Sequence, residues 1–361
     1  MQRESNLGFG WSCAEADTSN RVYAYASNNL WAVLGLEALS SLLTRYHRIE
    51  KSVYFKSEAE SIENEMRSAL NETVVMTKYG PLVPFQFGYT AKPWNLSICR
   101  DTFVDLDNET YNNYISRTNF RNEINEEQDL SENTYANYRY YLEMLSSTLL
   151  KKEEAEAIVN MREHLGGELL GMSRLYSGID DWPAANYARF LLSNDYIDKY
   201  LLLMYAHMAH HGNPDLMIYY EQVAIDGGVI APDCVPSLLL VSIMSVWMFC
   251  FEPIREDAVY LLRGIPSKWL NNINEFGFSQ IGCTFGKINL QVKSQLDYIE
   301  ISFTLPERNI GKTIYVDLRL PEELSFSKVI EGRELLQNIE KGYRLCFKKN
   351  LRGCISVKVS R

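Results

Sequence analysis

The side chains best suited to chemistry gather in residues 210–226, which read HHGNPDLMIYYEQVAID. Two histidines precede a glycine and a proline, and two tyrosines, Glu221 and Gln222 follow. Carboxylates can cleave glycosidic bonds, and aromatic rings with hydroxyls suit sugar rings. Because apolar helical patterns flank the stretch, we expect it to present these groups between two helices.

Further carboxylates recur in the loops between the helical patterns. Glycosidic hydrolysis needs two of them, an acid and a base or nucleophile, at a separation of about 5 to 9.5 Å. Glu163 and Glu168 flank a glycine pair that ends one helical pattern, and Glu168 is the better candidate because Glu163 fits a solvated helix residue. The candidate carboxylates are therefore Glu168, Asp180, Asp181, Glu221 and Asp233.

Each of these carboxylates also has a structural interpretation. Asp180 and Asp181 precede Trp182 at a predicted helix start, where a negative charge stabilises the helix dipole. Asp233 is placed to act as an N-cap, and Glu221 to cap or pair at a helix end. The sequence leaves both interpretations open.

The histidines raise the question of a metal site. His207 and His211 are four residues apart and so share a helix face. However, the stretch HMAHH lacks the glutamate of an HExxH motif and offers no evident third ligand. His210 and His211 fit the C-terminal end of a helix, so we expect no metal, and a role for His211 in binding a sugar hydroxyl.

Other motifs for cofactors and nucleophiles do not appear in the sequence. The glycines lack the GxGxxG and GxxxxGK spacings, and no serine lies in a GxSxG elbow. The seven cysteines are scattered without a CxxC pair, which gives no zinc or disulfide framework. We therefore expect no cofactor.

Composition limits the classes of partner. The chain has 361 residues and a net charge of -10, with 46 acidic and 36 basic side chains, so it lacks the basic patch typical of nucleic-acid or anionic-membrane binding. The most apolar run, 238–251, is shorter than the roughly 20 residues that span a bilayer. The N-terminal residues lack an apolar signal region. The sequence as it stands fits a cytoplasmic protein, or an exported one if an N-terminal part precedes it.

Helical periodicity dominates the first three quarters of the chain. The segment 27–46, with Ser27 as N-cap, and the segment 57–70 are expected to form an antiparallel hairpin. Residues 73–126 lack the period and predict a long excursion with one or two short strands. Further helices are expected at 135–149, at 151–165, as a pair within 183–211, and at 237–251, whose apolar residues on all sides predict a buried helix.

The period changes to two near the C-terminus. Six segments alternate apolar and polar residues, as half-buried antiparallel strands do: GKINLQVKSQ, YIEISFTLP, KTIYVDLRLP, SKVIEGREL, YRLCFKK and GCISVKVS. The pair Glu331-Gly332 lies where a tight hairpin turn is expected. The boundary falls within 266–277, which predicts a helical domain at 1–272 and a β-sandwich-like domain at 273–361.

Three stretches carry a resemblance to a known superfamily. They are GGELLGMSRLYSGIDDWPAANYA, the YYEQ that precedes APDCVPSLLLVSIMSVWMFCFE, and IPSKWL ahead of the all-β tail. Together they resemble the C-terminal half of bacterial six-hairpin glycosidases, the (α/α)6 superfamily that includes α-L-rhamnosidase-like enzymes. The resemblance covers residues 20–361 and implies a toroid of helical hairpins followed by an antiparallel β-domain, with Glu221 as general base.

The chain departs from this superfamily in length. A complete toroid has twelve helices, whereas the periodicity predicts about seven. The barrel is therefore expected to be incomplete, or to be completed by self-association or by a separately encoded N-terminal half.

These observations predict a glycoside hydrolase-like protein acting on oligo- or polysaccharide. Glu221 would be the base, and Glu168, Asp180 or Asp181 the acid or a hydroxyl ligand. One alternative is a truncated, non-catalytic carbohydrate-binding or structural remnant. Another is a polysaccharide lyase using a tyrosine and a histidine, which the lack of a basic cluster disfavours. The expected substrate-binding residues are Asp180, Trp182, Tyr219, Tyr220, Gln222, His211 and Asp233.

Overall fold

The computed structural model of the chain describes residues 26–83, 139–164, 167–175, 178–224, 227–271, 273–306, 311–321 and 328–361, and the backbone of three short strands, β1 (Gln2–Arg3), β2 (Gly10–Cys13) and β3 (Val22–Tyr23). Its contacts define two compact units. Unit 1 comprises Met1–Tyr187 and Tyr220–Pro232, and unit 2 comprises Ala188–Tyr219 and Asp233–Arg361. The domain boundary expected at residue 272 stays a prediction.

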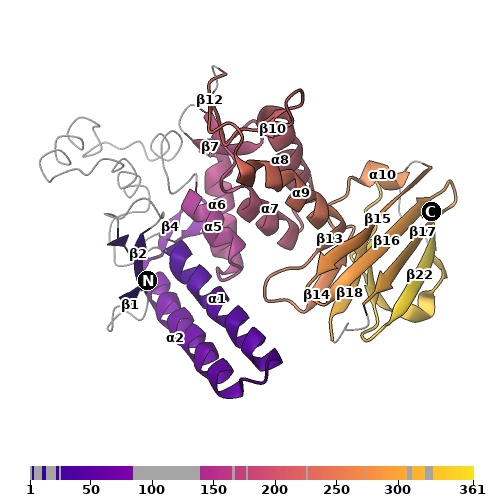
Figure 1. Cartoon of the computed structure of the whole chain (residues 1–361), viewed down its shortest axis with the longest axis horizontal. Helices are drawn as coiled ribbons and strands as arrows, with labels where there is room; N and C mark the ends of the chain where they lie inside the picture. Colours follow the sequence, from indigo (N-terminus) through magenta and orange to yellow (C-terminus); the bar gives the residue numbers. More distant parts are fainter. Residues whose placement is uncertain are drawn as a thin grey trace, which may run out of the picture. The chain divides into compact units, whose positions relative to one another are not determined.

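Unit 1 begins with the expected helical hairpin, α1 (Ala26–Arg45) and α2 (Ile49–Thr73), which lie side by side in Figure 1. The hydroxyls of Ser40 and Ser52 lie 2.9 Å apart and join the two helices near their connection. Ile62, Met66 and Leu70 of α2 are buried, as their spacing predicted. The proposed N-cap was wrong, because Ser27 lies inside α1 and its hydroxyl is buried.

Two further helices of unit 1 are α5 (Tyr141–Ser146) and α6 (Lys152–His164). The N-terminal part of the helix predicted from residue 135 lies outside the described residues. Glu154 holds the start of α6, because its carboxylate accepts a hydrogen bond from the Lys151 amide at 2.9 Å. The same carboxylate pairs with Arg67 of α2 at 2.9 Å, so one side chain both caps α6 and joins it to α2.

The short strands expected in the excursion after α2 are present as β4 (Val75–Thr77) and β5 (Gly80–Leu82), and most of the excursion lies outside the described residues. Sequence analysis missed a five-stranded antiparallel sheet in unit 1, of order β12-β11-β8-β7-β6. Its strands are too short to show a period. They are β6 (Glu168–Leu169), β7 (Met172–Leu175), β8 (Gly178–Asp180), β11 (Gln222–Ala224) and β12 (Val229–Ile230).

The predicted helix pair within 183–211 is confirmed as α7 (Ala184–Ser193), which crosses the division between the units, and α8 (Ile197–His210). In unit 2, α9 (Val235–Phe249) follows, and the Tyr200 hydroxyl of α8 donates to the Met244 carbonyl of α9 at 2.5 Å. The prediction that this helix is buried on all sides was wrong, since one face of α9 is exposed. Among the described residues, no helix is long and apolar enough to cross a membrane.

The C-terminal part of unit 2 contains two five-stranded sheets (Figure 1). One has the order β15-β16-β17-β22-β19 and is antiparallel throughout, and the other has the order β13-β14-β18-β21-β20 with one parallel pair, β14 with β18. The strands are β13 (Cys250–Phe251), β14 (Ala258–Leu261), β15 (Asn274–Cys283), β16 (Gly286–Ser294), β17 (Tyr298–Leu305), β18 (Thr313–Asp317), β19 (Lys328–Glu331), β20 (Leu336–Glu340), β21 (Arg344–Phe347) and β22 (Gly353–Ser360).

Alternation explains why these segments form a two-sheet core. Every second residue of β17 is buried, as the period-two pattern predicted. The rings of Phe303 on β17 and Phe347 on β21 meet edge to face at 5.1 Å, so side chains from both sheets share one core. A short helix, α10 (Ser267–Asn271), precedes the first long strand.

Two details of this region differ from the prediction. The tight hairpin expected at Glu331-Gly332 was wrong, because β19 and the following β20 belong to different sheets. Instead Gly332 takes a left-handed conformation, φ 80°, ahead of a 3-10 turn (Arg333–Leu335). In addition, β13 occupies the last two residues of the helix predicted at 237–251, and β14 lies within the range assigned to the helical domain.

A cluster of charges in unit 2 joins the turn between α7 and α8 to the sheets. Asp317 on β18 receives hydrogen bonds from Arg263 at 2.9 Å and from Arg344 at 2.6 Å. Asp195, in the turn, receives bonds from Lys341 at 2.6 Å and Tyr343 at 2.5 Å. Arg319 contacts both carboxylates. The guanidiniums also lie over tyrosine rings, with Arg263 4.6 Å from the ring centre of Tyr260.

This environment shifts the acidities of both carboxylates. Burial raises the pKa of Asp195, but hydrogen bonds from Lys341 and Tyr343 and the nearby arginine charges outweigh it, and the net pKa is well below its usual range. The pKa of Asp317 is likewise lowered, because the hydrogen bond from Arg344 and the surrounding guanidiniums outweigh burial. A carboxyl group whose pKa is lower in the folded state than in the unfolded state stabilises the fold at pH values above its unfolded pKa of about 4. This stabilisation is lost as the pH falls below that value.

We therefore expect the free energy of unfolding to fall as pH is lowered from 5 to 3, and Asp317→Asn to remove part of that dependence. Urea unfolding at pH 7, 5 and 3 measures this. Asp257→Asn is the matched control, because the Asp257 side chain is 93% exposed. The account is contradicted if both variants keep the same pH dependence as the wild type.

Candidate functional site

The register of the unit 1 sheet determines which candidate residues face one another. Asp180 of β8 lies opposite Gln222 of β11 and, on its other side, opposite Ser173 of β7. Ser173 lies opposite Glu168 of β6. Directly opposite residues point to the same face of a sheet, so Glu168, Ser173, Asp180 and Gln222 form one row across it.

Asp181 and Glu221 extend this register by one residue. The Asp181 amide donates to the Glu221 carbonyl at 3.1 Å, and the Glu221 amide donates to the carbonyl of Ala231 at 3.4 Å. Since successive side chains alternate, Asp181 and Glu221 fall on the face opposite to Asp180 and Glu168. Opposite residues in such a pair have Cβ atoms about 5 Å apart, so both carboxyl groups can reach one sugar.

The surroundings of this pair combine burial with an exposed aromatic ring. Asp181 is 2% exposed, and Glu221 is half-buried. Trp182, the next residue, is 47% exposed, and the Arg139 guanidinium lies 4.9 Å from its ring centre. The backbone of Trp182 is fixed as well, because its amide donates to Oδ1 of Asp180 at 2.7 Å. This hydrogen bond supports the structural interpretation of Asp180 as a carboxylate that stabilises the start of a helix.

Glu168 has a different environment. Arg162 of α6 is 1% exposed and donates to the Gly167 carbonyl and the Ser173 hydroxyl, each at 3.2 Å. Burial lowers the pKa of the Arg162 guanidinium, and the negative charge of Glu168 opposes this shift. Within the described part of the chain, Oε1 of Glu168 is buried and accepts no hydrogen bond. Glu168 thus serves as the counter-charge of a buried arginine.

The distance from Glu221 distinguishes two of the three acid candidates, Glu168 and Asp181. Glu168 is three strands away from β11 in the sheet order. At about 4.8 Å per strand this is roughly 14 Å, which exceeds the upper limit of about 9.5 Å for an acid and base that share a sugar. Asp181 lies on the adjacent strand end and on the same face as Glu221. The arrangement therefore favours Asp181 over Glu168 as the partner.

Four residues singled out from the sequence belong to unit 2 and are described there alone: His207, His211, Tyr219 and Asp233. His207 and His211 of α8 stack with ring centres 5.3 Å apart, and Tyr219 stacks on His207 at 5.0 Å. Both histidines are fully buried, as expected for rings that pack together rather than for an open ligand site. Tyr219 lies on β10 (Ile218–Tyr219), which pairs with β9 (Gly212–Asn213).

The remaining candidates differ in exposure. Tyr220 and Gln222 are half-buried. Asp233 is exposed and has a left-handed backbone, φ 60°, and its N-cap interpretation was wrong because Cys234 is the cap residue of α9. Glu163 is exposed, which agrees with its interpretation as a solvated helix residue. No group of three or more His, Cys, Asp or Glu side chains in the described segments could hold a metal ion.

Sequence reasoning missed two arginines of this site. Arg162 lies in MREHL, where the glutamate drew attention, and Arg139 contacts Trp182 from a point 43 residues earlier in the chain. A signal for Arg162 was present, because it follows Ile158 at helical spacing on the apolar face of α6. For Arg139 the sequence offered no comparable signal.

Comparison with known proteins gives structural similarity without sequence similarity. No protein-family model matches the chain, and no curated protein matches it. Three solved structures are similar. An α-L-rhamnosidase from Dictyoglumus thermophilum has a TM-score of 0.45 and 8% sequence identity, and the match covers 92% of this chain and 32% of that one. A glycoside hydrolase has a TM-score of 0.34 and 10% identity, with 92% and 64% covered, and an α-L-rhamnosidase from Streptomyces avermitilis complexed with L-rhamnose has a TM-score of 0.37 and 10% identity, with 85% and 31% covered. The chain thus spans less than two thirds of each, and similarities of this size do not assign a family.

The stack in unit 2 requires a glycine at residue 212. A Cβ there would lie 2.6 Å from the Met208 carbonyl oxygen and 3.1 Å from the Tyr219 ring. We expect Gly212→Ala to lower the free energy of unfolding by about 1 to 3 kcal/mol. Gly282→Ala is the control, because a Cβ at Gly282 has no atom within 4 Å. Equal urea midpoints for the two variants would show that the close approach is not a constraint.

The counter-charge role of Glu168 predicts a stability effect. Glu168→Gln leaves the guanidinium of Arg162 buried without its negative neighbour, and we expect a loss of about 1 to 3 kcal/mol in the free energy of unfolding. Glu163→Gln, at the exposed end of α6, should change it by less than about 0.5 kcal/mol. Thermal and urea unfolding measure both, and a stable Glu168→Gln variant refutes the role.

Proposed function

We propose that the protein is a glycoside hydrolase-like protein that acts on oligo- or polysaccharide through paired carboxyl groups. The observation that supports this most is the hydrogen bond from the Asp181 amide to the Glu221 carbonyl at 3.1 Å, which sets two carboxylate residues opposite each other at one end of the unit 1 sheet. The superfamily resemblance of the surrounding stretches agrees with a base at Glu221.

In this proposal Glu221 acts as general base and Asp181 as its acid partner. The ionised Glu221 takes a proton from a water molecule that attacks the anomeric carbon, while the protonated Asp181 gives its proton to the leaving glycosidic oxygen. After the product leaves, Glu221 releases its proton to solvent and Asp181 takes one up, which restores the starting protonation states. Attack by water gives inversion at the anomeric carbon, whereas direct attack by the Glu221 carboxylate would give retention.

The exposed groups next to the pair would bind the sugar. The ring of Trp182 offers a stacking surface, and Arg139 beneath it fixes the plane of the ring. A sugar would approach Asp181 from the side of Glu221 and Trp182, because these two side chains are more exposed than Asp181. Tyr220 and Gln222 alternate with Glu221 and so fall on the other face of the sheet, where Gln222 lies opposite Asp180, and their expected role in sugar binding stays a prediction.

We expect Glu221→Gln to reduce hydrolysis of a panel of aryl glycosides and plant-type oligosaccharides by at least about a hundredfold, since general-base catalysis contributes about 10² to 10⁴. Glu163→Gln, an exposed carboxylate of the same unit, should keep wild-type rates. The assay is release of the aryl group. Unchanged turnover in Glu221→Gln would remove Glu221 from the mechanism.

A second candidate function is supported by the exposed apolar faces of α8 and α9. Apolar residues recur there at helical spacing in unit 2, a pattern typical of a surface that another protein covers. This favours a non-catalytic remnant that completes its barrel by association. A monodisperse monomer by light scattering, together with measurable hydrolysis, argues against it. The exposed residues are Leu202, Tyr205, Met208, Val235, Leu238, Leu239, Ile243 and Val246.

A further inference from the structure

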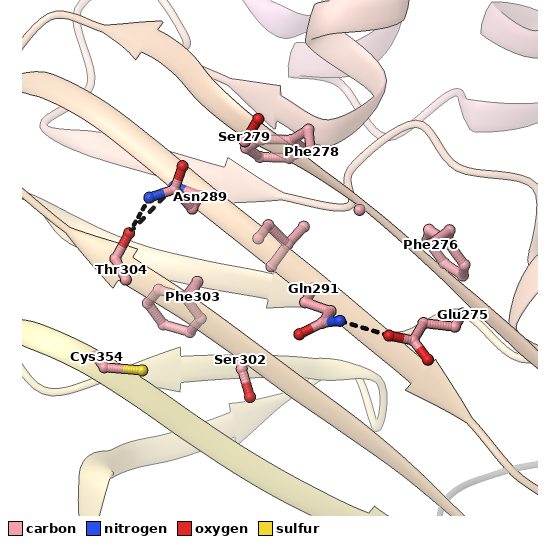
Figure 2. Close-up of a pocket in the computed structure, with 12 residues that line it drawn as sticks. Glu275, Phe276, Phe278, Ser279, Asn289, Gln291, Ser302, Phe303, Thr304 and Cys354 are labelled. Carbon is pink, nitrogen blue, oxygen red and sulfur yellow. Dashed lines mark hydrogen bonds between the residues drawn. The ribbon is translucent and has the colours of Figure 1, made fainter.

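The outer face of the β15-β16-β17-β22 part of the antiparallel sheet carries an open groove in unit 2 (Figure 2). Its volume is about 620 Å³, within the range of about 300 to 1,000 Å³ for ligand sites. It crosses four neighbouring strands, which at about 4.8 Å per spacing is roughly 14 Å. The groove is thus long enough for an extended chain molecule rather than for a single small group.

The groove has a floor of uncharged hydrogen-bonding side chains. Gln291 lies opposite Ser302, and Ser302 lies opposite Ser356, so three strands contribute to one row. In the next row along these strands, Asn289 lies opposite Thr304, and the side-chain amide of Asn289 donates to the Thr304 hydroxyl at 2.9 Å. Figure 2 shows Asn289 and Gln291 on one strand and Ser302 and Thr304 on the next, with the hydrogen bond between Asn289 and Thr304 drawn.

This floor keeps hydrogen-bonding capacity for a ligand. The Gln291 amide donates to Oε1 of Glu275 at 2.5 Å, and among the described residues nothing donates to its own Oε1 or to Oε2 of Glu275. Hydroxyl and amide groups both donate and accept, as sugar hydroxyls do. Gly277 lies opposite Gln291, and a Cβ there would collide with the carbonyl oxygen of Leu290, so glycine allows the two strands to approach closely.

The distribution of charge disfavours an anionic ligand. Glu275 is the one charged residue among those that line the described groove, and Lys293 lies 4.0 Å from it. A phosphate or sulfate polymer would need several cations along its path, and the lining offers none. An uncharged polyhydroxylated chain meets no such requirement.

We propose that this groove is a binding surface for a neutral polysaccharide chain, separate from the carboxylate pair of unit 1. Hydroxyls of successive sugars exchange hydrogen bonds with Asn289, Gln291, Ser302 and Thr304. The side-chain carboxylate of Glu275, held by Gln291, accepts from a further hydroxyl at the edge of the groove. The surface does not depend on hydrolysis at Glu221, since its residues belong to another unit.

Affinity electrophoresis of the full-length protein in gels containing a neutral polysaccharide tests the proposal. The panel is arabinoxylan, galactomannan, mixed-linkage β-glucan and dextran, with polygalacturonate and dextran sulfate as charged comparisons. We expect retardation by at least one neutral polymer and by neither charged polymer. Asn289→Ala combined with Gln291→Ala should weaken that binding at least tenfold, while Glu221→Gln should leave it unchanged.

Two variants separate loss of binding from loss of folding. Ser302→Trp fills the groove without removing the two amides, and it should also abolish retardation. Asn338→Ala removes a matched exposed amide from β20 of the other sheet and should bind like the wild type. Thermal unfolding of each variant confirms its fold. No retardation by any neutral polymer, or retardation that both groove variants preserve, overturns the proposal.

Discussion

The pairing of β11 with β8 is the constraint on which the candidate site depends. Residues 222–224 lie beside 178–180 although some forty residues separate them in the chain, and the segment between them forms helices of unit 2. The register of this pairing, not the spacing along the sequence, sets Glu221 opposite Asp181. A slip of one residue would move Glu221 to the other face of the sheet, so the chemistry proposed for the pair depends on this register.

The same sheet explains the division of roles among acidic residues. Both faces carry carboxyl groups, yet their surroundings differ. On one face Glu168 compensates the buried guanidinium of Arg162, and Asp180 fixes the backbone of Trp182. On the other face a backbone hydrogen bond sets Asp181 opposite Glu221, which is the pair proposed to share a substrate. Of the four acidic residues at this sheet, Glu168 and Asp180 therefore have structural roles.

Sequence patterns predicted the long elements and missed the short ones, for physical reasons. The hairpin of α1 and α2, the pair α7 and α8, and strands such as β17 bury one face over many residues, so their periods are visible in the sequence. Strands of two to four residues, as in the unit 1 sheet, are held by pairing with distant segments and show no period. Glu221, Asp181 and Trp182 were predicted as site residues from residue type. Their relative positions required the sheet register, and the contact of Arg139 with Trp182 required the tertiary fold.

The pH dependence of hydrolysis by Asp181→Asn and Asp180→Asn tests the central claim most directly. If Asp181 and Glu221 form the working pair, the wild type has a bell-shaped profile of kcat/KM, Asp181→Asn loses the limb due to the acid, and Asp180→Asn keeps both limbs. A profile that Asp181→Asn leaves unchanged, with a limb lost in Asp180→Asn, would place the partner on the other face of the sheet and contradict the account.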